Sequence, residues 1–168
     1  MEKTTGATLT FRLKYIILPV VILLLSVILT AFFYPRLPVE VAYHFRDGSP
    51  DRWLSRSAIV LWTLLPQLFL TLLSGAVTWG IAKLSRQYIK PESTGIRPER
   101  IILFMGNMIA LPQIILGFAM LDIFSYNSYQ IHLLPLWVFV LIVMVAGGII
   151  LGIFSFQSIR QVWRINKE

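Results

Sequence analysis

Cysteine is absent from this sequence, and its absence excludes disulfides, thiolate metal ligands and cysteine nucleophiles. Histidine is scarce: only His44 and His132 occur, so a catalytic apparatus built on histidine has few possible members. The glycine-rich phosphate loop, the His-Glu-x-x-His zinc motif and the Gly-x-Ser-x-Gly nucleophile elbow are missing as well. We therefore expect a protein that is not an enzyme and that holds no metal or other cofactor.

Charged residues are also scarce. They make up 14% of the chain, whereas about 25% is typical of globular proteins. Hydrophobic residues make up 57% of the 168 residues, so a soluble domain of this size would lack polar surface. The net charge of +7 would indicate nucleic-acid binding in a soluble protein, but here the basic residues flank apolar stretches and act as topology signals. We expect the lipid bilayer as the main partner and no nucleic acid.

Four apolar stretches contain no Asp, Glu, Lys, Arg or His, and each has the length of about 20 residues that a helix needs to cross a bilayer. They cover residues 15–34, 58–82, 101–121 and 133–158. The sequence thus predicts an all-α integral membrane protein, a bundle of four transmembrane helices that forms a single membrane domain. Because the spans hold no ionisable residue, an ion-coupled transporter is disfavoured.

Lysine and arginine are distributed unequally between the two sides of these spans. Eleven lie at the termini and between the second and third spans, against four on the opposite side. Since loops rich in Lys and Arg stay in the cytoplasm, we expect a multi-pass protein of the cell (cytoplasmic) membrane with both termini inside. Residues 35–57 are then a short structured extracytoplasmic loop.

This first outer loop has a local pattern of its own. Residues 39–46 alternate apolar with mostly polar side chains, which predicts an extended segment. Asp47-Gly48 is typical of a turn. Ser49-Pro50-Asp51 has the composition of a helix start, which predicts a short helix through Trp53 into the second span. We expect the loop to pack over the outer mouth of the bundle.

The same loop carries a family resemblance, through Leu37-Pro38, His44-Phe45, Gly48-x-Pro50-Asp51-Arg52-Trp53 and Ser55-Arg56 in this order. The pattern resembles the domain-of-unknown-function family 1648, the N-terminal membrane domain of SdpI-type proteins, over roughly residues 15–80. The resemblance implies a prokaryotic membrane protein. SdpI-type proteins are known for immunity to a secreted peptide toxin and for membrane signalling, which implies recognition of a peptide, a lipid or a partner protein.

Five loop residues are candidates for such recognition. Phe45 and Trp53 would be apolar anchors, while His44, Asp51 and Arg52 would set the polar geometry. The alternative is a structural role, in which the histidine bonds to the loop backbone and the aspartate caps a helix.

A second candidate site lies inside the spans. Leu-Pro-Gln occurs twice, and a helical rise of 1.5 Å per residue places Pro66 and Pro112 about 12 and 14 Å from the outer ends of antiparallel helices. Gln67 and Gln113 are therefore expected at one depth, with Asn107 near them. Two interpretations are open: a midplane polar site of a small-molecule carrier or flippase, and a plain interhelical hydrogen bond.

The fourth span contains one GxxxG sequence, formed by Gly148 and Gly152. Small residues at this spacing let two helices approach closely. The motif is equally compatible with a homo-oligomer and with packing inside one chain.

Overall fold

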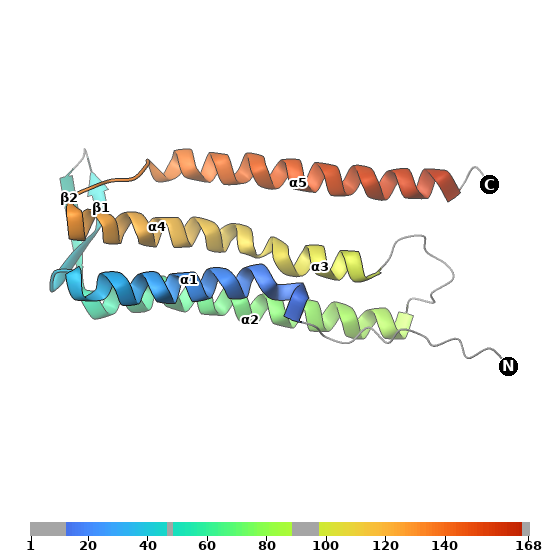
Figure 1. The fold of residues 1–168 in the computed structure, drawn as a ribbon, viewed down its shortest axis with the longest axis horizontal. Helices are drawn as coiled ribbons and strands as arrows, with labels where there is room; N and C mark the ends of the chain where they lie inside the picture. The colour runs from blue at the N-terminus through green and yellow to red at the C-terminus, as the bar shows by residue number, and fades with distance from the viewer. Residues whose placement is uncertain (1–12, 47–48, 89–97, 166–168) are drawn as a thin grey trace.

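The computed structural model describes residues 13–46, 49–88 and 98–165, which form a bundle of long helices with a β-hairpin across one end (Figure 1). We call this the hairpin end. The elements in chain order are η1 (Leu13–Ile16), α1 (Ile17–Phe33), η2 (Tyr34–Arg36), β1 (Glu40–Arg46), β2 (Ser49–Ser55), α2 (Arg56–Tyr88), α3 (Pro98–Met108), α4 (Ala110–Tyr129) and α5 (Leu136–Ile165).

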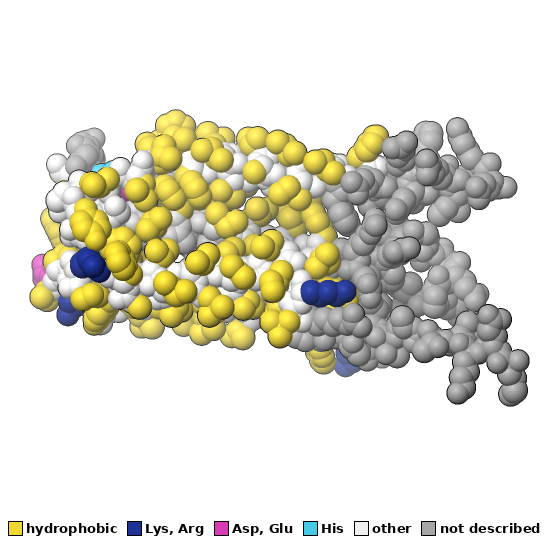
Figure 2. Space-filling model, viewed as in Figure 1, with side chains coloured by type: hydrophobic (Ala, Val, Ile, Leu, Met, Phe, Trp, Pro, Cys, Tyr) yellow, Lys and Arg dark blue, Asp and Glu magenta, His cyan; other side chains and the backbone are white. Residues whose placement is uncertain are grey.

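Four helical stretches of the described chain are long and apolar enough to cross a membrane, as the sequence predicted. They are Leu13–Arg36, Arg56–Leu84, Ile102–Tyr129 and Leu136–Ile153. In each stretch, between 11% and 22% of the most apolar 18-residue segment is buried inside the protein. Most of the apolar side chains therefore face outward. Figure 2 shows hydrophobic side chains over the described part of the bundle. Such an apolar exterior suits a lipid environment.

The third span differs from its predicted bounds of 101–121. It continues to Tyr129, and it is broken into α3 and α4 at Ile109. Pro112 explains the break, because proline has no N–H to donate to the carbonyl of Met108 four residues earlier. Asp122, the first residue after the predicted bounds, therefore lies within α4.

The hairpin is the departure from an all-α fold, and the predicted helix start at Ser49 is wrong. Residues 49–55 instead pair with β1 in an antiparallel register that runs from Arg46↔Ser49 to Glu40↔Ser55. The helix begins at Arg56, where the hydroxyl of Ser55 accepts a hydrogen bond from the N–H of Ala58 at 3.4 Å. The expected turn at Asp47-Gly48 lies outside the described residues.

The buried residues divide into two apolar clusters with polar groups between them. The cluster at the hairpin end comprises Phe33, Leu37, Val41, Ile59, Met120 and Phe124. The cluster at the opposite end comprises Tyr15, Ala82 and Ile102. The buried polar side chains between them along the helices include Ser26, Gln67, Ser74 and Gln113.

Helix α5 packs against α4 at the edge of the bundle. The rings of Phe118 and Phe139 stack with their centroids 3.8 Å apart. Gly147 also faces α4. A side chain at this position would collide with Leu111 of α4. Gly148 and Gly152 face open space, with no atom within 4 Å of the place that a methyl group would take. The GxxxG motif is therefore not used to pack the described part of the chain.

Candidate functional site

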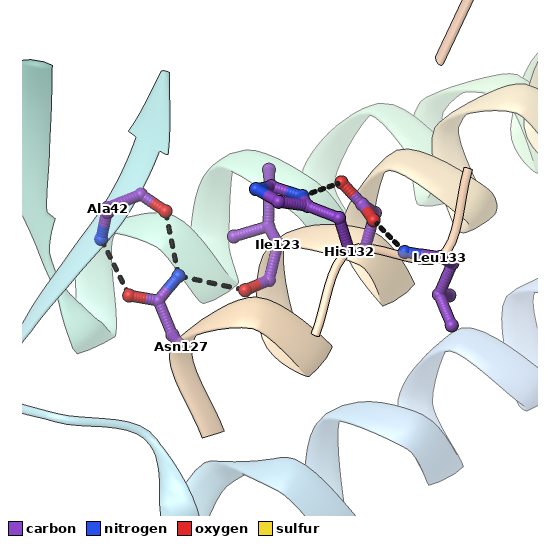
Figure 3. A network of polar contacts seen from close by, with 6 residues as sticks. Ala42, Ile123, Asn127, His132 and Leu133 are labelled. Carbon is purple, nitrogen blue, oxygen red and sulfur yellow. Dashed lines mark hydrogen bonds and ion pairs between the residues drawn. The ribbon is translucent and has the colours of Figure 1, made fainter. Parts of the chain in front are cut away.

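The hairpin is held to the bundle by Asn127 of α4 (Figure 3). Its Oδ1 accepts the N–H of Ala42 at 2.8 Å, and its Nδ2 donates to the carbonyl of Ala42 at 2.8 Å. Nδ2 also donates to the carbonyl of Ile123 at 2.8 Å, which fixes the amide on its own helix. The side chain thus imitates a neighbouring strand and closes the outer edge of β1.

Phe45 contributes an aromatic contact on the same side of the hairpin. Its ring meets those of Tyr126 and His132 edge-on, at centroid distances of 4.6 Å in each case. The rings of Tyr126 and His132 stack at 4.5 Å. Phe45 is half-buried in this cluster, so its ring anchors the hairpin to α4 rather than facing away from the bundle.

The connection between α4 and α5 completes this support. Asp122 accepts the N–H of Leu133 at 2.8 Å through Oδ1, and Nδ1 of His132 lies 3.2 Å from its Oδ2 (Figure 3). Helix α4 ends at Tyr129, and the left-handed backbone of the next residue, Gln130, lets its N–H bond to the carbonyl of Tyr126 at 2.7 Å. His132 is therefore held where its ring meets the hairpin.

Arg56 ties the hairpin to the end of α1. Its N–H donates to the carbonyl of Val39 at 2.9 Å. Its guanidinium lies 4.6 Å from the ring centroid of Tyr34 and donates to the carbonyls of Tyr34 and Leu37, each at 3.4 Å. The arginine thus satisfies carbonyls that lie beyond the last turn of the helix.

Four of the five predicted recognition residues remain exposed on the hairpin. Nδ1 of His44 lies 2.6 Å from Oδ1 of Asp51, which joins the two strands through their side chains. Arg52 lies opposite His44 in the register. The side chain of Trp53 is 52% exposed. Phe45 is the fifth predicted residue, and it instead contacts Tyr126 and His132 on the side of the hairpin that faces α4.

In the described part of the chain, β1 is the one strand that pairs with β2. Ala42, which directs both backbone groups to Asn127, is directly opposite Trp53. Directly opposite residues of an antiparallel pair share their hydrogen-bonding type, so the N–H and C=O of Trp53 also point away from the partner strand. They face the free edge of β2 beside the exposed indole.

Inside the bundle, Gln67 and Gln113 lie together as their equal depth predicted. Each amide nitrogen donates to the backbone carbonyl of the other glutamine at 3.0 Å. Nε2 of Gln113 also lies 2.9 Å from Oγ1 of Thr71. Both glutamine side chains are completely buried. The pair is a reciprocal clamp between α2 and α4.

Asn107 does not join this pair, so the expected group of three is divided. Its Oδ1 accepts the N–H of Leu18 at 3.0 Å, and its Nδ2 donates to the carbonyl of Leu103 at 2.8 Å. Leu18 lies in the first turn of α1, where backbone N–H groups have no partner within the helix. Asn107 therefore acts as a cap supplied by a neighbouring helix.

Comparison with known proteins matches residues 21–65 to the family model described as Domain of unknown function (DUF1648). This part of the chain is similar to that domain. The match confirms the resemblance seen in the loop, over a narrower range than 15–80. It takes in most of α1, the hairpin and the first part of α2. No curated protein and no solved structure matches the chain.

The four exposed hairpin residues lie within the matched residues 21–65, whereas three of the residues that support the hairpin lie beyond residue 65. Asn127, Tyr126 and His132 all lie on α4 or just after it. Sequence reasoning missed all three supports. Their one available signal was a group of polar and aromatic residues at the end of an apolar stretch, which is also typical of a membrane interface.

Proposed function

We propose that this protein is a non-enzymatic membrane protein of the cell membrane whose hairpin recognises a peptide or protein segment outside the cell. In this proposal both termini lie in the cytoplasm, in agreement with the distribution of Lys and Arg. The observation that carries the proposal is the two-sided construction of the hairpin. One side is fixed by Asn127 and Phe45, and the other displays Trp53 beside the hydrogen-bonded pair of His44 and Asp51.

The chemistry of the displayed side favours a polypeptide as the partner. An open strand edge offers backbone N–H and C=O groups that an extended peptide can pair with. Tryptophan and arginine are the residues that most often dominate binding energy at protein interfaces, and Arg52 and Trp53 are adjacent here. A rigid support lowers the entropy lost on binding, because the hairpin is ordered before the partner arrives.

Replacement of Trp53 tests this proposal most directly. The full-length protein is cross-linked in native membranes and captured material is identified by mass spectrometry. We expect the wild type to capture a partner and Trp53→Ala to capture about tenfold less of it, or even less. A tenfold loss corresponds to an interface anchor that contributes about 1.4 kcal/mol.

Trp62→Ala is the matched control, because Trp62 lies on α2 and is 67% exposed without belonging to the hairpin. It should capture the partner as the wild type does. Trp53→Pro removes the indole and also the edge N–H, which the hairpin itself does not use, so its capture should be at least as weak as that of Trp53→Ala. Equal capture by wild type and both Trp53 variants would contradict recognition through the hairpin.

The alternative of a carrier or flippase with a midplane polar site has less support. The amide nitrogens of Gln67 and Gln113 are engaged with each other's backbone, and Asn107 caps α1 instead of joining them. This arrangement favours interhelical packing over a site that a passing solute would occupy.

We also propose that copies of the chain associate through α5. The proposal rests on the open space beside Gly148 and Gly152, which permits close approach of a second helix. Replacing either glycine with isoleucine should shift the population in native membranes toward the monomer. Gly80→Ile is the control, since Gly80 also faces open space but lies on α2. An unchanged oligomer distribution in the α5 variants would exclude this interface.

A further inference from the structure

The hairpin carries two arginines whose charges are not neutralised within the described part of the chain. Arg46 of β1 and Arg52 of β2 are both exposed. Neither guanidinium forms a hydrogen bond, an ion pair or a ring contact with a described residue. Arg52 is also the direct neighbour of the exposed Trp53.

The two carboxylates of the described strands are engaged or placed elsewhere. Oδ1 of Asp51, the nearest carboxylate in the sequence, lies 2.6 Å from Nδ1 of His44. Glu40 lies opposite Ser55 at one end of the strand register, whereas Arg52 lies opposite His44. The guanidinium of Arg52 therefore keeps its N–H donors unused.

The other two arginines at the hairpin end have structural partners. Arg56 donates to the carbonyls of Tyr34 and Leu37, each at 3.4 Å. Arg36 donates to the carbonyl of Phe32 at 2.6 Å, and its guanidinium lies 4.2 Å from the centroid of that ring. An arginine without such a task in the folded chain can offer its planar donor fork to a ligand.

Arg52 and Trp53 lie on opposite faces of the sheet but along one edge. Successive side chains of a strand point to opposite faces. Both side chains border the edge to which the N–H and C=O of Trp53 point, away from β1. A strand added at this edge would also place its side chains on the two faces in turn. One of its residues would lie opposite the indole, and the next would lie opposite the guanidinium.

We propose that the hairpin binds an extended acidic peptide segment, which pairs with the edge of β2 and places a carboxylate opposite Arg52 and an apolar side chain opposite Trp53. This inference rests on the proposed function and adds the chemistry of the partner. A carboxylate fits because the guanidinium can bind both of its oxygens. A basic segment fits poorly, because it would set like charges opposite each other at Arg52 while Asp51 is engaged with His44.

Selection from a library of random peptides displayed on phage tests this inference. The target is the full-length protein in phosphatidylcholine nanodiscs, and empty nanodiscs remove peptides that bind lipid. We expect the wild type to enrich peptides in which Asp or Glu is next to an apolar residue. Arg52→Gln should lose the preference for Asp and Glu, and Arg52→Glu should replace it by a preference for Lys and Arg.

Arg46→Gln is the matched control. Arg46 is exposed and has no ion pair with a described residue, as is true of Arg52, but it lies on β1. This variant should select the same peptides as the wild type. If Arg46→Gln loses the acidic preference and Arg52→Gln keeps it, the assignment to Arg52 is wrong.

Trp53→Ala separates this inference from the proposed function. Suppose that the wild type selects peptides which Trp53→Ala loses, but that these peptides show no excess of Asp or Glu. Recognition through the hairpin would then stand, and the acidic partner would be excluded. Selection of no peptide above the level of empty nanodiscs would contradict both proposals.

A synthetic copy of one selected peptide gives the quantitative check. Replacing its acidic residue with the corresponding amide should weaken binding to the wild type by about tenfold or more, as expected for lost hydrogen bonds to a charged group. The same replacement should leave binding to Arg52→Gln unchanged, because the partner of the carboxylate is already absent. An equal loss on both proteins would show that the carboxylate binds elsewhere and would overturn the inference.

Discussion

Gly106→Ala should destabilise the bundle by at least about 3 kcal/mol, the upper part of the range for an overpacked core position. A Cβ atom at this position would overlap the carbonyl oxygen of Tyr15 and would lie 2.7 Å from Oγ1 of Thr78. The overlap with Tyr15 involves backbone, which a change of side-chain rotamer does not relieve. The close approach of α3 to η1 is therefore possible only because Gly106 has no side chain.

The location of Pro19 makes this approach possible. Proline has no N–H, so the carbonyl of Tyr15 lacks the usual helical donor four residues later and stays available at the surface of the helix. Ser74 reinforces the contact by donating to the carbonyl of Gly106 at 2.6 Å. A helix shifted away from the new methyl group would lose this bond as well.

Thermal unfolding in a mild detergent, followed by circular dichroism, measures the loss. The control is Gly80→Ala, where nothing lies within 4 Å of the added methyl group and alanine is the better helix former. The control should unfold at or slightly above the wild-type temperature. Similar unfolding temperatures for the two variants would show that α3 does not approach η1 as closely as described.

The four long helices were predictable because the length and composition of an apolar stretch decide membrane compatibility without any knowledge of tertiary structure. The pairing of Gln67 with Gln113 was predictable for a related reason. Depth in a bundle follows from counting residues along two antiparallel helices. The face of a helix is harder to predict, and Asn107 shows why. It lies six residues before Gln113, about 240° around an ideal helix, and the break at Ile109 separates them further.

The second strand was missed because its local and non-local signals conflict. Ser49-Pro50-Asp51 satisfies the local signature of a helix start. Its pairing with β1 satisfies backbone groups of both strands at once, and this non-local gain decides the structure. The real cap of α2 is Ser55, six residues later. Pro50 is compatible with β2 because this strand lies at the edge of the sheet.

The residues that support the hairpin could not be predicted from the sequence for a different reason. Asn127 and Ala42 are 85 residues apart, and neither residue type reveals its partner. An asparagine near the end of an apolar stretch is ordinary at a membrane interface, whereas one that closes a strand edge has a specific structural role. A contact that holds the proposed recognition surface thus comes from a residue outside the matched residues 21–65.

Asn127→Leu is therefore expected to release the hairpin while the helices stay folded. The substitution removes three hydrogen bonds and leaves the N–H and C=O of Ala42 without partners, at a cost of about 2–4 kcal/mol. Leucine is similar in size, so packing changes little. Hydrogen exchange of the full-length protein in bilayer nanodiscs should show faster exchange in residues 40–46, with α1 and α2 unaffected.

Asn127→Asp is the informative companion variant. The carboxylate keeps an acceptor for the N–H of Ala42 but loses both donor interactions of Nδ2. Exchange in residues 40–46 should then be intermediate between the wild type and Asn127→Leu. If hairpin order matters for recognition, capture of a partner should decline from the wild type to Asn127→Asp and again to Asn127→Leu. Every exposed residue of the hairpin is unchanged in these variants. Wild-type capture in a variant with fast exchange would show that the partner itself orders the hairpin on binding.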